Sequence, residues 1–242
     1  TARAGEAEML ARRHLIEEKA DQALYWAPWS PVRLSESSLE NLRAALAEGR
    51  GVLLSACHFG PVYNATSVGA SLRRPVFTLV GDWLTTTEPE ASYWGRRVVR
   101  RQEGLRDNDA RMVPAAGSFP IVCELLAQGE VVLVQFDVRG VQRTRFLGKP
   151  VALRTGTVRL AAASGAPVVP VRTLRQGVRI SLEAAEPLDP RAYADPMRLH
   201  EELARIHEHW ILEYPEALED PLRPGAWEDA TAAEWPPRAE EG

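Results

Sequence analysis

Short apolar runs bounded by glycine or proline alternate with amphipathic segments along most of the chain. The first run, 51–57, leads directly into His58-Phe59-Gly60. Short and almost uninterrupted apolar runs are typical of strands that are buried on both faces of a sheet. Two later runs flank Arg175-Gln-Gly177, which predicts an antiparallel hairpin. The predicted strands are 52–56, 75–80, 111–114, 130–136, 167–174 and 178–182.

Helical periodicity fills the intervals between these strands, and the serines at 35–38 offer N-caps for one of the predicted helices. The predicted helices are 4–25, 37–48, 61–72, 88–103, 118–126, 155–164 and 196–213, and 140–150 is expected to be a loop. The alternation predicts a single α/β domain with a mixed, mostly buried sheet flanked by helices. We expect N-terminal helices over 1–50, an α/β core over 51–214 and an irregular tail over 215–242.

Composition narrows the class of protein. The 242 residues fit one large domain, and 45% hydrophobic with 26% charged residues is ordinary for a soluble globular protein. A net charge of −4 gives no indication of nucleic-acid binding. Cys57 and Cys123 lie in apolar contexts, which favours free thiols in a reducing compartment. No cysteine and histidine spacing is typical of a metal site, so we expect neither a metal nor a bound cofactor.

No apolar run reaches the roughly 18 residues that a membrane span needs, and no signal peptide is evident. These features predict a cytoplasmic protein. The helix 4–25 and the aromatic cluster 25–29 allow peripheral contact with the inner face of the membrane. The alternative is that the helix packs on its own domain, and the many acidic residues in it favour that interpretation.

His58 follows a predicted buried strand, and open α/β sheets place their sites at the carboxyl ends of strands. A neutral imidazole is the natural base for a hydroxyl near neutral pH, although a histidine here also fits a structural role. Asp137 and Arg139 follow the strand 130–136, so they are expected at the same edge of the sheet. They either orient a polar substrate or form a plain ion pair.

Arginines cluster on the predicted helix 88–103 in two pairs, one turn apart. They suit the phosphates of coenzyme A, of an acyl-carrier arm or of a lipid head group, or else form a solvated basic face. His200, His207 and His209 lie on a charged helix and are predicted at the surface. A hydrolase that uses Ser55 or Cys57 is a weaker hypothesis, because neither residue lies in a Gly-x-Ser-x-Gly elbow.

The order of several motifs resembles a known family. The segment Gly51 to Gly60 is followed by 129–137, then by Phe146-Leu-Gly-Lys-Pro150 with Thr155-Gly156, and then by Gly165-Ala-Pro-Val-Val-Pro-Val171. This order is similar to that of the lysophospholipid acyltransferase superfamily, in particular the bacterial lipid A biosynthesis (lauroyl/myristoyl) acyltransferases and the related mannoside acyltransferases. The resemblance covers about 8–215.

The resemblance implies direct transfer of an acyl group from acyl-CoA or acyl-carrier protein to a small-molecule or lipid acceptor. In the family a histidine removes the proton of the acceptor, and a carboxylate five positions later orients that histidine. His58 matches the histidine, but the carboxylate position is occupied by Tyr63. Either Tyr63 or Asn64 holds the imidazole through a neutral hydrogen bond, or the charge comes from Asp137 or Asp82. Two further alternatives are an amine acceptor that needs less help from a base, and loss of catalysis with a binding role retained.

We therefore expect an acyltransferase that acts on a hydroxyl or amine acceptor, with His58 as the base and Tyr63 in place of the acid. The alternative is a catalytically impaired homologue that binds an acyl ligand or a partner. The residues expected to contact substrate, the thioester carrier or the developing oxyanion, or to support the site, are Arg97, Arg101, Asp137, Arg139, Thr155 and Arg159.

Overall fold

A computed structural model describes residues 6–24, 32–86, 110–177 and 179–220, together with positions 93, 95–96, 99–100 and 103–104. Arg97, Arg101 and most of the predicted helix 88–103 lie outside the described residues.

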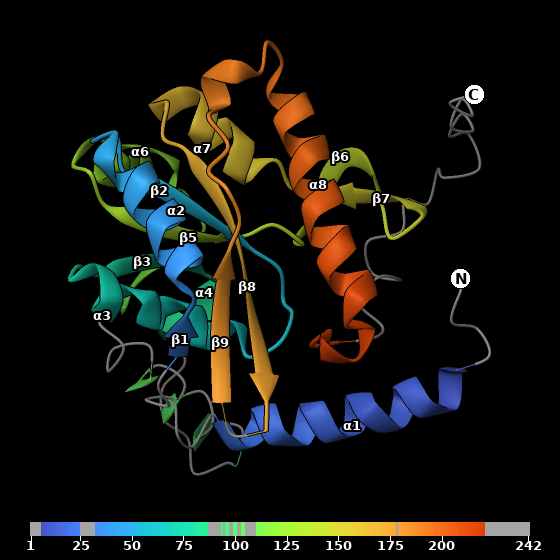
Figure 1. The fold of residues 1–242 in the computed structure, drawn as a ribbon. Helices are drawn as coiled ribbons and strands as arrows, with labels where there is room; N and C mark the ends of the chain where they lie inside the picture. Colours follow the sequence, from blue (N-terminus) through green and yellow to red (C-terminus); the bar gives the residue numbers. More distant parts are fainter. Residues whose placement is uncertain are drawn as a thin grey trace.

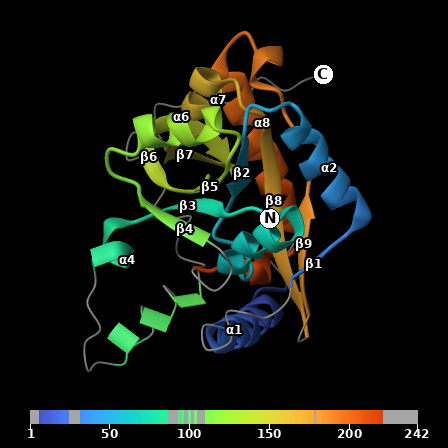
Figure 2. The same ribbon diagram turned by 90° about the vertical axis from the view of Figure 1, so that its left-hand side faces the viewer.

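The described strands form a seven-stranded sheet of order β1-β9-β8-β2-β5-β3-β4 and a separate hairpin (Figure 1). Five neighbouring strands, from β8 to β4, are parallel, whereas β9 pairs antiparallel with β8 and carries β1 parallel to itself at the edge. Figure 2 shows β1 and β9 on the opposite side of the sheet from β3 and β4. The strands are β1 (Val32–Leu34), β2 (Val52–Ala56), β3 (Val76–Val80), β4 (Ala110–Pro114), β5 (Val131–Gln135), β8 (Val168–Gln176) and β9 (Arg179–Ala184).

Helices cover both faces of this sheet, as Figure 1 shows. One face packs against α2, η2 and α3, and the other packs against α6, α7 and α8. The described helices are α1 (Ala7–Leu24), α2 (Glu36–Ala47), η2 (Val62–Ser67), α3 (Val68–Leu72), α4 (Asp82–Thr86), α6 (Phe119–Ala127), α7 (Gly156–Ser164), η3 (Pro190–Ala192), α8 (Pro196–Glu213) and η4 (Pro215–Ala217).

Side-chain alternation along β2 explains why an apolar run forms the centre of the fold. Leu53 packs into the core beneath α6 and α8, while Val52 and Leu54 pack into the core beneath α2. All five residues of β2 are buried. Each large aliphatic side chain removed from water contributes about 1.5–3 kcal/mol to the free energy of unfolding. Because helices cover both faces of the sheet, side chains on both faces of β2 make this contribution. The predicted α/β class with a mixed, mostly buried sheet is thus confirmed, and the structure shows in addition that most of the strands are parallel.

The predicted loop at 140–150 is wrong, because the segment forms the antiparallel hairpin of β6 (Arg139–Phe146) and β7 (Lys149–Leu153). Leu147 and Gly148 both have positive φ angles, 54° and 74°, which suits the tight turn between two such strands. Thr144 and Phe146 are buried, whereas Arg143 is exposed. Because the segment contains several arginines, this alternation does not produce an apolar run. The search for apolar runs therefore did not predict the two strands.

Other boundaries differ in smaller ways. The predicted helix 61–72 begins as the 3-10 turn η2 and becomes α-helical only at α3. The edge strand β1 was not predicted, since three residues are too few to show a period. The helices α2 and α8, the strand β4 and the β8–β9 hairpin agree with prediction. Cys57 and Cys123 are free thiols, as expected.

The N-terminal helix α1 is joined to the domain by ion pairs. Arg175, near the end of β8, pairs with Glu17 and Asp21 of α1. Burial raises the pKa of Asp21 to about 6, although the charge of Arg175 opposes this shift. Leu15 and Ile16 of the same helix are exposed. No helix in the described part of the chain is long and apolar enough to span a membrane.

Candidate active site

His58 lies two residues beyond β2, at the carboxyl end of a central parallel strand. Its side chain is 17% exposed, whereas Cys57 and Phe59 on either side are buried. Chain neighbours in an extended segment point to opposite sides, so the histidine faces a cavity while its neighbours enter the core. The buried strand thereby fixes the backbone that carries the imidazole.

The turn after His58 requires glycine. Gly60 has φ +58°, and a Cβ atom there would lie 2.1 Å from the backbone oxygen of Thr173. The Gly60 amide donates a hydrogen bond to the Ala217 carbonyl oxygen at 2.6 Å. The Glu219 amide donates to the His58 carbonyl oxygen at 3.0 Å. The loop carrying His58 is therefore packed against β8 and held by the segment that follows α8.

A carboxylate contacts His58. Oδ1 of Asp137 lies 2.8 Å from Nδ1 of the imidazole, and the carboxylate also accepts from the His58 backbone N–H, at 3.1 Å to each oxygen. Asp137 is completely buried. Strand register explains the contact, because Ala56 of β2 pairs with Gln135 of β5 and the two side chains follow their strands at equivalent positions. Parallel neighbouring strands end at one edge, so the histidine and the aspartate meet there.

The contact with Asp137 assigns the tautomer of His58. A carboxylate accepts hydrogen bonds, so Nδ1 carries the ring proton and the lone pair is on Nε2. A buried carboxylate in this position holds the ring in one orientation and stabilises the imidazolium that forms when Nε2 takes a proton. The pair has the geometry of a general base and the residue that positions it.

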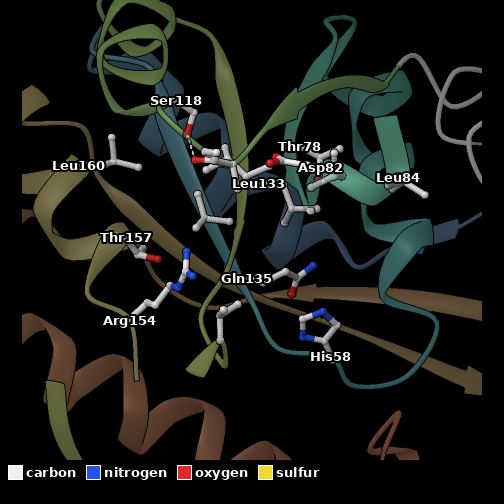
Figure 3. A pocket seen from close by; sticks show the side chains of 18 of the residues that line it. His58, Thr78, Asp82, Leu84, Ser118, Leu133, Gln135, Arg154, Thr157 and Leu160 are labelled. Atoms are coloured by element: carbon white, nitrogen blue, oxygen red, sulfur yellow. Dashed lines mark hydrogen bonds between the residues drawn. The ribbon is translucent and has the colours of Figure 1, made fainter. Parts of the chain in front are cut away.

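Beside His58 lies a cavity of about 560 Å³, within the range of about 300–1,000 Å³ that is usual for ligand pockets. Figure 3 shows His58 and Gln135 at one end of the pocket and Ser118 and Leu160 towards the other. Its walls are mostly apolar and come from the ends of β3 and β5, from η2 and α4, and from the starts of α6 and α7. Apolar lining residues include Val62, Leu79, Leu84, Phe119, Leu133 and Leu160.

The model of the bacterial lipid A biosynthesis acyltransferase family matches residues 28–218. The chain belongs to this family. A phosphatidylinositol mannoside acyltransferase from Mycobacterium tuberculosis (strain CDC 1551 / Oshkosh) is 29% identical over 147 residues, which is 57% of this chain and 43% of that relative. The chain thus matches less than half the length of this relative.

A solved structure is also similar to this member of the lipid A acyltransferase family. The 1-acyl-sn-glycerophosphate acyltransferase PlsC from Thermotoga maritima aligns with a TM-score of 0.48 and 16% identity, covering 83% of this chain and 78% of that chain.

Some of the predicted site residues of this lipid A acyltransferase family member line the pocket beside His58, and one of them contacts the imidazole. Tyr63 is half-buried on η2 and lines the pocket, as does Asp82 at the start of α4. The carboxylate that contacts Nδ1 of His58 is that of Asp137, two residues after β5. Asp137 and Asp82 were the two residues that the sequence offered as alternative sources of this charge. The fold therefore supplies an acid at a distance of 79 positions along the chain.

Three further predicted residues lie on the α7 and β6 side of the site. Arg139 is exposed at the start of β6, and Thr155 is half-buried before α7. Arg159 is exposed, with its guanidinium 5.4 Å from the centre of the Phe119 ring. Sequence reasoning missed Arg154, which lines the pocket and donates from Nε to the Arg139 carbonyl oxygen at 3.2 Å. No group of side chains suited to a metal ion occurs among the described residues.

The prediction of surface histidines on α8 is wrong for two of the three. His200 and His207 are buried, while His209 is exposed. Their spacing of seven residues places both on one face of the helix, which the sequence interpretation overlooked because charged residues surround them. Nε2 of His207 lies 3.0 Å from the Ser55 hydroxyl on β2. Burial lowers the pKa of each histidine to about 4, and the Asp137 charge opposes this for His207.

These buried histidines are expected to make the family member less stable in mild acid. The unfolded chain takes up protons below pH 6.5, but folded His207 does not until about pH 4, so stability falls as the pH is lowered through this window. Between pH 7 and pH 5 the loss of unfolding free energy is about 2 kcal/mol per histidine. Urea titrations should show a smaller loss for His207→Asn than for the wild type.

His209→Asn is the matched control on the exposed face of the same helix, and it should leave the pH dependence unchanged. Asp21 acts in the opposite direction, because its raised pKa makes the folded state bind a proton more readily as the pH falls through 6. That contribution is common to all three proteins and cancels in the comparison. Equal losses in the wild type and in His207→Asn would contradict the assignment of His207 as a buried neutral imidazole.

Proposed function

We propose that the protein transfers an acyl group from a thioester, acyl-CoA or acyl-carrier protein, to a hydroxyl or amine acceptor, with His58 as the general base. The observation that carries this proposal is the contact of His58 Nδ1 with the buried carboxylate of Asp137, at one end of an apolar pocket. That contact supports a base role for His58 although position 63 is a tyrosine, since an acid contacts the imidazole without the usual spacing. Family membership supports the acyl-transfer chemistry.

The proposed step uses His58 twice. Nε2 takes the proton of the acceptor hydroxyl while its oxygen attacks the thioester carbonyl carbon, forming a tetrahedral intermediate. The carbon–sulfur bond then breaks, and the imidazolium returns the proton to the leaving thiolate. Asp137 remains ionised throughout and stabilises the imidazolium, so it acts as a positioning residue. The products are an ester, or an amide from an amine acceptor, and a free thiol.

The pocket suits the acyl chain. Its walls are aliphatic and aromatic over most of their area, and His58 lies at one end of it, where the thioester carbonyl has to lie. Burial of the chain removes apolar surface from water at about 25 cal/mol per Å², which provides binding free energy away from the reacting atoms. Tyr63 lines the same pocket, so we assign it to the substrate contact surface.

Cationic side chains are proposed to contact the anionic parts of the donor. Arg154 lines the pocket, and the exposed Arg139 lies beside it. Arg159 and Thr155 extend the same side of the site along the start of α7. Arginine suits phosphate because its planar guanidinium donates two parallel hydrogen bonds. The proposed roles of Arg97 and Arg101 concern residues outside those described.

The test is incubation of the purified wild-type chain with acyl-CoA and, separately, with acyl-carrier protein, each with and without 1-O-octylglycerol or octylamine. We expect release of the free thiol that depends on the acceptor, and a matching acylated product by mass spectrometry. Tight binding of the thioester without thiol release would contradict this function and would favour the catalytically impaired homologue. The competing hydrolase is recognised by thiol release that no acceptor accelerates, with free acid as the product.

A further inference from the structure

Arg154 lies at the same end of the pocket as His58 and Asp137. It is the only arginine or lysine among the described residues that line this pocket. Its backbone N–H donates to the carbonyl oxygen of Val138 at 2.9 Å, and Val138 directly follows Asp137. Figure 3 shows the side chains of Arg154 and His58 on opposite sides of this end of the pocket. A cationic group therefore lies beside the base and the carboxylate that contacts it.

The hairpin of β6 and β7 fixes the position of Arg154. The register of the two strands shifts between Arg139 and Gln142, as in a β-bulge, and bulges beside active sites redirect side chains. Gly140 lies in this irregular stretch, and a Cβ atom there would lie 2.5 Å from the backbone nitrogen of Arg154. Nε of Arg154 donates to the Arg139 carbonyl oxygen at 3.2 Å. The guanidinium is thus held in place before a substrate binds.

The two terminal nitrogens of Arg154 remain accessible. Neither makes a hydrogen bond or an ion pair with the described residues, and Arg154 is exposed at the mouth of the pocket. By contrast, Arg172 and Arg175 of β8 each pair with two carboxylates. A guanidinium has five N–H donors, of which the contact with Arg139 uses one. The remaining donors of Arg154 are available to a ligand.

The first turn of α7 adds hydrogen-bond donors on the same side of the pocket. Gly156 and Thr157 line the cavity, and the cap residue Thr155 makes no side-chain hydrogen bond to the first-turn amides. Those N–H groups have no partner within the helix, and the helix dipole favours negative charge beside them. Thr157 is only 4% exposed, and its hydroxyl has no hydrogen-bond partner among the described residues. Figure 3 shows its side chain directed into the pocket beside Arg154, so this side suits an anion.

The proposed step produces one anion close to His58. When the acceptor oxygen attacks, an electron pair of the thioester carbonyl moves onto the carbonyl oxygen, which stays negative until the carbon–sulfur bond breaks. The phosphates of acyl-CoA and of acyl-carrier protein are separated from the sulfur by the whole pantetheine arm. A cation beside the base is therefore close to the carbonyl oxygen of the donor and distant from its phosphates.

We propose that Arg154, with the Thr157 hydroxyl and the first-turn amides of α7, stabilises the oxyanion of the tetrahedral intermediate. Donors that are fixed where charge develops lower the barrier, and loss of one of them costs about 10²–10³ in turnover. The electron pair then returns to the carbon–oxygen bond, and the thiolate leaves and takes the proton of the His58 imidazolium. This inference rests on the proposed function for His58 as the base, and it leaves Arg139 and Arg159 as contacts to the phosphates of the donor.

Steady-state kinetics separate an oxyanion contact from a phosphate contact. Arg154→Met keeps the length of the side chain without its charge, and it should lower kcat about 10²–10³-fold with less than about a threefold change in KM for acyl-CoA. Arg154→Gln replaces it where the methionine variant fails to fold. Arg154→Lys restores the charge and should recover at least about tenfold of the lost turnover. Arg43→Met, on the exposed side of α2, is the matched control and should change neither constant.

Binding of two matched analogues tests the site without turnover. The first is a difluoroketone analogue of decanoyl-CoA, whose hydrate has a tetrahedral carbon and an ionisable oxygen. The second is S-decyl-CoA, which has no oxygen at that carbon. By calorimetry, Arg154→Met should bind the ketone hydrate at least about tenfold more weakly than the wild type and S-decyl-CoA equally well. An equal loss for both analogues would overturn the inference and assign Arg154 to the carrier, and no loss for either would also overturn it.

Thr157→Val tests the contribution of α7, since valine keeps the shape of threonine without its hydroxyl. Affinity for the ketone hydrate should fall about tenfold, and affinity for S-decyl-CoA should not change. Unchanged affinity for both analogues would remove Thr157 from the site. Selective loss of ketone binding in Arg154→Met, from a wild type that releases no thiol, would contradict the proposed function and leave the oxyanion site intact. Turnover that is equal in the wild type and in Arg154→Met would do the reverse.

Discussion

His58→Ala is expected to lower the rate of acyl transfer by about 10⁴-fold or more, while acyl-CoA still binds. General acid–base catalysis contributes about 10²–10⁴, and His58 is proposed to serve both in removing the acceptor proton and in protonating the thiolate. Because the imidazole is only 17% exposed and contacts a buried carboxylate, the alanine variant also leaves Asp137 with fewer hydrogen bonds. The measurement is thiol release at saturating acyl-CoA and acceptor.

His58→Gln controls for that structural effect. Its side-chain amide can donate towards Asp137, but it cannot take a proton near neutral pH. Thermal unfolding should therefore be closer to the wild type in His58→Gln than in His58→Ala, while both variants lose activity. Activity within tenfold of the wild type in the glutamine variant would remove His58 from the mechanism.

Asp137→Asn is expected to lower turnover by about 10³–10⁴-fold, with a smaller effect on KM for the thioester. In the serine protease triad the equivalent replacement of the buried carboxylate by an amide costs about 10⁴ in turnover, because the imidazole adopts the wrong tautomer. Here an asparagine N–H directed at Nδ1 would favour the tautomer with its proton on Nε2. That tautomer has no lone pair facing the acceptor, so the base is lost although the ring is in place.

Two readouts distinguish this positioning effect from general disruption. The ¹⁵N NMR signals of the His58 ring should show an unprotonated Nε2 in the neutral wild type and an unprotonated Nδ1 in Asp137→Asn. Tyr63→Phe is the matched variant, since it removes the hydroxyl at the position where the family has its acid. A tautomer unchanged by Asp137→Asn, or a larger loss of turnover in Tyr63→Phe than in Asp137→Asn, would contradict the role given to Asp137.

The Asp137 contact also accounts for the departure at Tyr63. A carboxylate five positions after His58 would come from η2, on one face of the sheet. Asp137 instead comes from the neighbouring strand, and its contacts with both the ring and the backbone N–H of His58 bind the two strand ends together. If Asp137 has the role proposed for it, position 63 needs no carboxylate, and Tyr63 lines the pocket there.

The local pattern of apolar and polar residues was sufficient to predict much of the fold. The strands β2 and β5 follow from apolar runs, because burial on both faces leaves little room for polar side chains. The strands β3, β8 and β9 follow from apolar positions that alternate, over part of each strand, with polar or half-buried ones. The hairpin of β6 and β7 was missed, since its strands are half-solvated and β6 contains three arginines. His200 and His207 were misplaced at the surface, because burial depends on which helix face meets β6 and β2, and composition does not reveal that face.

The sequence by itself determined the α/β class, the place of His58 at a strand end and the resemblance to the family. Each of these depends on residues close together in the chain or on the order of motifs. Only the tertiary structure decided that Asp137 contacts His58 and that Gln135 faces the same cavity. Both depend on the in-register pairing of β2 with β5, whose residues lie 79 positions apart, and strand order and register arise from the packing of the whole sheet.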